Sequence, residues 1–125
     1  MEKDFLLPKE EYYETLWYIR RYPSFLSERE SILQGRGQSY GTPRGSEIGD
    51  PTAMTAIKLE RIDAKIQPVK NALEMIPKEY QKGILEAVIY RKRYPDYADT
   101  STWKRWRRRF VYWVAIWRRN NEEET

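Results

Sequence analysis

The chain has 125 residues, which is long enough for one domain with a modest core. Its formal net charge is +4. It contains no cysteine and no histidine, which excludes disulfides, thiol or imidazole metal ligands and the most common general base. The spacing of acidic residues shows no paired carboxylates at a shared site, so we expect a non-enzymatic protein without metal or cofactor. The sequence shows no signal peptide and no apolar run of about 20 residues, so we expect a cytoplasmic protein without a membrane partner.

Residues 1–34 are predicted to form an N-terminal helical arm. Pro8 stands where a helix would begin, and acidic residues just after it favour a helix N-terminus. Pro23 disfavours the helical conformation in the residue before it, so this helix is expected to end near Tyr22. A second short helix is expected to reach about Gln34. We interpret the pair as a docking or packing element.

Residues 35–50 are predicted to be a flexible linker. The stretch from 35 to 50 holds five of the six glycines and shows no apolar periodicity. Arg36 and Arg44 stand beside glycines and could approach phosphates, but the glycine spacing is not that of a nucleotide-binding loop. Any ordering of this stretch is expected to occur against a partner.

Residues 51–76 are predicted to form a long helix, because Asp50 can cap its free amides and Pro51 fits the first helical position. Pro68 removes one amide from the helix, so a bend is expected there. Apolar residues recur at gaps of three and four, as in a heptad seam. This seam either packs within its own domain or joins chains into a homo-oligomer. Its members are Leu59, Ile62, Ile66, Val69, Leu73 and Ile76.

Residues 77–119 are predicted to form a helical pair resembling a helix-turn-helix, followed by an acidic tail at 120–125. The first helix begins at Pro77 and ends before Pro95, and a short turn leads to the second. The second helix carries large apolar side chains at gaps of three and four, which predicts a face buried in the core. That face comprises Trp103, Trp106, Phe110, Trp113, Val114 and Trp117.

The opposite face of the second helix is basic. Residues 78–119 hold twelve lysines and arginines against four acidic residues, whereas residues 1–77 hold eleven against twelve. Positive charge concentrated in this way is typical of a protein that binds the phosphate backbone of DNA, and a major groove admits one such helix. The predicted DNA-binding residues are Lys104, Arg105, Arg108, Arg109 and Tyr112 of the second helix, with Arg91, Lys92 and Arg93 ending the first.

The chain resembles small phage- and prophage-encoded proteins of Gram-positive bacteria, the late-operon transcriptional regulators of the RinA and ArpU type. The likeness lies in IPKEYQKGI at 76–84, YRKRYP at 90–95 and TWKRWRRRFVYWVA at 102–115, and extends to GDPT at 49–52. The resemblance implies an all-α fold whose C-terminal half is similar to the DNA-binding region of sigma factors. It also implies double-stranded DNA, and a host protein such as RNA polymerase, as partners in a bacterial cytoplasm.

One departure from that family concerns the turn. Only eight residues separate Tyr94 from Trp103, too few for the complete middle helix of the sigma-like unit. We therefore expect contacts with the DNA backbone to dominate over base reading, or the basic helix to bind a protein. Two alternative functions stay open: a DNA-packaging accessory similar to a terminase small subunit, and an inhibitor or adaptor of a host nucleic-acid enzyme.

Overall fold

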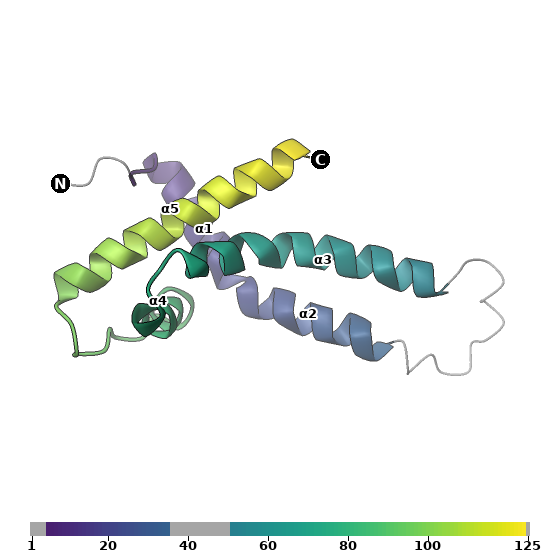
Figure 1. Ribbon diagram of the computed structural model, residues 1–125, viewed down its shortest axis with the longest axis horizontal. Helices are drawn as coiled ribbons and strands as arrows, with labels where there is room; N and C mark the ends of the chain where they lie inside the picture. The colour runs from purple at the N-terminus through teal and green to yellow at the C-terminus, as the bar shows by residue number, and fades with distance from the viewer. Residues whose placement is uncertain (1–4, 36–50, 125) are drawn as a thin grey trace. The chain divides into compact units, whose positions relative to one another are not determined.

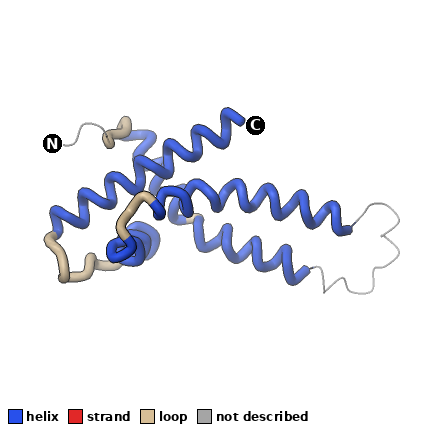
Figure 2. The backbone as a smooth tube through the Cα atoms, in the orientation of Figure 1, coloured by secondary structure: helices blue, strands red, loops and turns tan. Residues whose placement is uncertain are grey.

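The computed structural model describes residues 5–35 and 51–124. Within these ranges the chain forms α-helices joined by short turns and no β-strand (Figure 2), so the predicted all-α class is confirmed. The predicted linker at 35–50 lies outside the described residues, except for its first glycine, which ends a helix. The helices are α1 (Lys9–Arg20), α2 (Tyr22–Gly35), α3 (Pro51–Glu74), α4 (Lys78–Tyr90) and α5 (Thr100–Glu124) (Figure 1).

Prolines mark the N-terminal helix boundaries much as predicted. Pro8 precedes α1, and its carbonyl oxygen accepts a hydrogen bond from the Tyr12 amide at 2.9 Å. Helix α1 ends at Arg20 and α2 begins at Tyr22. Pro23 therefore lies in the first turn of α2, where its missing N–H removes no helical hydrogen bond.

Helix α3 continues through Pro68 and ends at Glu74, two residues before the predicted end. Pro68 itself is buried. At the C-terminal end of α3, the side chain of Gln81 binds two backbone carbonyls. Its Nε2 donates to the carbonyl oxygens of Leu73 and Ile76, at 2.9 Å each. The Leu73 carbonyl also accepts the Ile76 amide at 2.9 Å, a bond of the kind that tightens the last turn of a helix.

The chain divides into two compact units, and α3 contributes to both. The first unit is Met1–Tyr22 with Gln67–Thr125, and the second is Pro23–Ile66. In the first unit, α1 contacts α4 and α5, and α4 contacts α5; Figure 1 shows α5 crossing α1. Fully buried apolar side chains from all three helices form its core: Leu16, Ile19, Ile84, Val88, Phe110, Val111 and Val114.

The turn between α4 and α5 is folded around Trp103, which has no exposed surface. Tyr94 lies parallel to the indole, with ring centroids 5.6 Å apart, and Tyr80 and Tyr97 meet it edge-on at 5.0 and 5.4 Å. A Cβ atom placed on Gly83 of α4 would come within 2.7 Å of the same indole. The absence of a side chain at Gly83 thus lets α4 approach α5 closely.

The buried face of α5 differs from the predicted one. Trp103, Phe110 and Val114 are buried as expected, but Val111 and Ala115 join them, whereas Trp106, Trp113 and Trp117 are half-buried. The prediction that all five tryptophan and phenylalanine rings form the core was therefore wrong for three of them. The neighbouring helices pack on the side of the smaller residues, and the larger rings lie at the margins of that contact. Helix α5 also continues to Glu124, so the predicted tail is helical over its described part.

The second unit contains α2 and the first part of α3. Arg29 Nε lies 2.7 Å from Asp63 Oδ1, and the Lys65 ammonium lies 5.9 Å from the centroid of the Phe25 ring. The predicted oligomerisation seam runs along α3 through both units, and its last member, Ile76, follows the helix. Among its members Ile62, Ile66, Val69 and Ile76 are buried within one chain, while Leu59 and Leu73 are half-buried. Because most of the seam is already covered, it gives no argument for pairing between chains.

Candidate nucleic-acid interface

Five of the eight predicted DNA-binding residues have exposed side chains. They are Arg91, Lys92 and Arg93 in the turn after α4, and Lys104 and Arg105 in the first turns of α5, and together we name them the basic face. None of the five forms an ion pair or hydrogen bond with another side chain in the described part of the chain. Their positive charge is therefore available to an external anion.

Aromatic packing brings the two parts of the basic face to one end of the first unit. The turn is held on α5 by the stacking of Tyr94 on Trp103, and its other end is held by Tyr97, whose hydroxyl donates to the backbone carbonyl of Glu79 in α4. Arg93 directly precedes Tyr94 in the chain, and Lys104 directly follows Trp103. The stacked pair thus places these cations on neighbouring segments. The sequence indicated the charges, but not this arrangement.

Arg91 directly follows the last residue of α4 and has the left-handed conformation, with φ 56° and ψ 33°. The amides of Arg91 and of the next residue, Lys92, both donate to the carbonyl of Glu86, the second at 3.4 Å. Arg91–Arg93 therefore follow the helix and do not form its last turn, which corrects the sequence prediction. Glycine is the usual residue at such a position, because a Cβ atom there costs about 1 kcal/mol.

Replacement of Arg91 by glycine is expected to raise the free energy of unfolding by about 0.5–1 kcal/mol, since the left-handed backbone is then unstrained. The same change removes one cation of the basic face, so duplex DNA affinity is expected to fall. Urea unfolding and a DNA titration on the same preparation measure both effects. A variant that lost stability would contradict the assigned backbone conformation.

The remaining three predicted residues, Arg108, Arg109 and Tyr112, are half-buried. Phe5 meets the Tyr112 ring edge-on at 5.4 Å, and the Arg109 guanidinium lies 4.7 Å from the Phe5 ring centroid. The same guanidinium lies 5.0 Å from the Trp106 ring. At Arg109 and Tyr112 the predicted basic face is therefore partly covered by Phe5.

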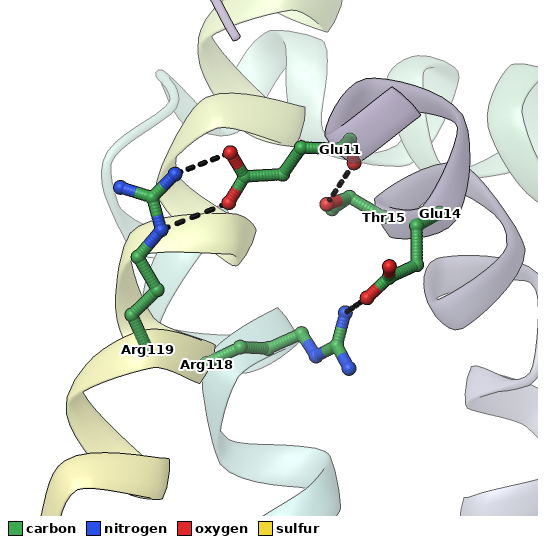
Figure 3. Close-up of polar contacts among 5 residues, drawn as sticks. All are labelled: Glu11, Glu14, Thr15, Arg118 and Arg119. Carbon is green, nitrogen blue, oxygen red and sulfur yellow. Dashed lines mark hydrogen bonds and ion pairs between the residues drawn. The ribbon is translucent and has the colours of Figure 1, made fainter. Parts of the chain in front are cut away.

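Acidic residues of α1 neutralise the C-terminal arginines of α5 (Figure 3). Arg118 Nη1 lies 3.4 Å from Glu14 Oε1, and Arg119 Nε donates to Glu11 Oε2 at 2.8 Å. Thr15 donates its hydroxyl proton to the Glu11 backbone carbonyl at 2.7 Å. With these arginines paired, the unneutralised positive charge of α5 is concentrated near its N-terminus, beside the turn.

A second group of cations surrounds Arg107 of α5. Burial lowers the pKa of Arg107, but hydrogen bonds to the hydroxyls of Tyr94 and Tyr12 outweigh it, and the net pKa is raised. Arg20 Nε donates to the carbonyl of Val88 in the last turn of α4 at 2.9 Å. Burial, and then the charges of the nearby Arg91 and Arg107, lower the pKa of Arg20. No sequence periodicity links these arginines, because they come from α1, the turn and α5.

A groove of about 350 Å³ opens beside Arg107. One part of it is cationic and another apolar, and its lining comprises Phe5, Leu6, Leu7, Tyr12, Tyr94, Lys104, Arg107 and Arg108. The described residues hold no cluster of three acidic side chains that could bind a metal ion.

No protein-family model matches this chain, and comparisons with curated proteins and with solved structures likewise found no match. Over residues 5–35 and 51–124, each helix is too short or too polar to cross a bilayer. The geometry of the basic face and of the groove therefore provides the basis for a functional proposal.

Proposed function

We propose that this protein is a non-enzymatic, phage-type transcriptional regulator that binds duplex DNA through the basic face. The supporting observation is the stacking of Tyr94 on Trp103, which puts the cations of the turn and those of α5 at one end of the first unit. No described carboxylate pairs with them. A surface that merely confers solubility mixes charges of both signs.

Contacts with phosphates would supply most of the binding energy. Of the predicted DNA-binding residues on α5, Lys104 and Arg105 are exposed, whereas Phe5 packs on Arg109 and Tyr112. An interface of this kind positions the protein on the duplex but carries little sequence information. Binding through several copies, with RNA polymerase as a second partner, would add selectivity; the resemblance to late-operon regulators motivates this part of the proposal.

The salt dependence of binding to a duplex tests the proposal. Five phosphate contacts predict a slope of log affinity against log salt of about −4.5, which weakens binding about 500-fold between 50 and 200 mM salt. A mobility-shift titration with the full chain measures this slope. Absence of duplex binding at 50 mM salt would reject the proposal and favour an acidic protein surface as the target.

The molecular mass of the protein in solution distinguishes the regulator from a packaging accessory. A monomer, dimer or tetramer agrees with a regulator, whereas a ring of many copies is expected of a protein similar to a terminase small subunit. Sedimentation equilibrium without DNA gives this mass directly.

A further inference from the structure

The groove beside Arg107 combines positive charge with apolar surface. Lys104, Arg107 and Arg108 supply the charge, and the segment from Phe5 to Leu7 supplies the apolar wall. No acidic side chain is among the residues lining it. Its volume of about 350 Å³ falls at the lower end of the range for small-molecule sites, about 300–1,000 Å³. A ligand of this groove should therefore be small, anionic at one end and apolar or planar at the other.

Arg107 has unused hydrogen-bonding capacity in this groove. Its Nη1 lies at a long 3.4 Å from the Tyr94 hydroxyl, while its Nε is buried and has no hydrogen-bond partner within the described residues. A buried guanidinium donor without an acceptor is costly, especially beside other cations. The charges of Arg91 and Arg107 both lower the pKa of Arg20, so the three guanidinium groups lie near one another. A bound anion at the groove would offset the repulsion among these cations.

A phosphate group fits this cationic end well. Guanidinium groups present several N–H donors in one plane and bind phosphate oxygens in pairs, and a lysine adds a compact charge. The Tyr12 and Tyr94 hydroxyls also line the groove and can donate hydrogen bonds. The apolar wall is suited to the flat surface of a base, which stacks on aromatic side chains without regard to sequence.

We propose that the groove binds one nucleotide, with its phosphate at Lys104 and Arg107 and its nucleoside against the wall formed by Phe5–Leu7. This site goes beyond the duplex-binding basic face: it shares Lys104 with that face, but Arg107 and the apolar wall belong to the groove alone, and it binds a single nucleotide. The nucleotide comes either from solution or from the phosphorylated end of a nucleic-acid strand. Both share the same chemistry, namely a phosphate monoester on a nucleoside.

Calorimetric titration of the full chain with AMP, adenosine and inorganic phosphate tests this assignment. AMP is expected to bind at least tenfold more tightly than either adenosine or phosphate alone, since each of these lacks half of the contacts. Saturable AMP binding that phosphate alone reproduces would overturn the nucleoside part. Absence of AMP binding at millimolar concentration would overturn the whole assignment.

Variants locate the site. Arg107→Gln and Lys104→Gln are each expected to weaken AMP binding at least tenfold, while Lys82→Gln, at an exposed position of α4 away from the groove, leaves it unchanged. Because Lys104 is exposed, Lys104→Gln should fold, and it still tests the site if Arg107→Gln does not fold. Unchanged AMP affinity in folded Lys104→Gln and Arg107→Gln proteins would place the nucleotide elsewhere and reject the proposal.

A 5′-phosphorylated tetranucleotide, compared with its unphosphorylated form, separates the two sources. Tighter binding of the phosphorylated strand than of AMP identifies a strand end, and equal binding identifies a free nucleotide; both agree with the groove site. Duplex binding is measured separately on the same protein. If the protein binds duplex DNA but not AMP, the nucleotide site in the groove is rejected. If it binds AMP but not duplex DNA, the proposed regulator function is rejected.

Discussion

Replacement of Trp103 by alanine is expected to lower the free energy of unfolding by about 3–5 kcal/mol. The indole has no exposed surface and is surrounded by Tyr80, Tyr94 and Tyr97, and each aromatic pair adds about 0.5–1.5 kcal/mol beyond the area it buries. Domains are stable by about 5–15 kcal/mol in total. The variant should therefore be marginally folded at room temperature.

Urea unfolding followed by circular dichroism measures this loss. Trp17→Ala is the matched control, because Trp17 is 61% exposed and its removal leaves no cavity. The control is expected to stay within about 0.5 kcal/mol of the parent. Equal midpoints for the two variants would show that Trp103 does not hold the turn between α4 and α5.

Conversion of Arg93, Lys104 and Arg105 to glutamine is expected to weaken duplex binding about 100-fold at moderate salt. Each exposed ion pair contributes about a fivefold factor, and the three residues come from both parts of the basic face. Removal of three phosphate contacts also reduces the salt slope by about 2.7. All three side chains are exposed, so the fold should be retained, which circular dichroism checks.

The control for this variant changes the same number of charges elsewhere. Lys58, Arg61 and Lys70 are exposed on α3, and their conversion to glutamine is expected to leave the salt slope almost unchanged. Equal losses in the two triple variants would mean that net charge, and not the basic face, determines affinity. An unchanged affinity in the first variant would favour a protein partner instead of DNA.

Local chemistry in the sequence was sufficient to predict the helices. Pro8 and Pro77 directly precede α1 and α4, because proline suits a helix start. The break expected near Pro23 falls at Arg21, and Tyr22, expected to leave the helix, is itself helical. Pro68 was also placed correctly inside α3, since the apolar periodicity continues on both sides of it. These constraints act within a few residues, so a single sequence contains them.

The surface available for binding depended on contacts between distant segments. The sequence placed Arg109 and Tyr112 on an open face, but Phe5 packs on both. A single phenylalanine outside any periodic pattern gives no signal of where it will dock. Three tryptophans expected in the core are half-buried for the same reason: periodicity identifies an apolar stripe, while the packing of neighbouring helices decides which side of it is covered.

The sequence by itself determined that this chain is all-helical, and that its excess positive charge lies in the C-terminal third, because both properties follow from local composition and spacing. Tertiary structure decided which of those charges remain available. Glu11 and Glu14 pair with arginines more than 100 positions later in the chain, whereas the cations of the basic face have no acidic partner among residues 5–35 and 51–124. Pairing over such separations depends on how α1 crosses α5, and short-range sequence patterns do not encode that crossing.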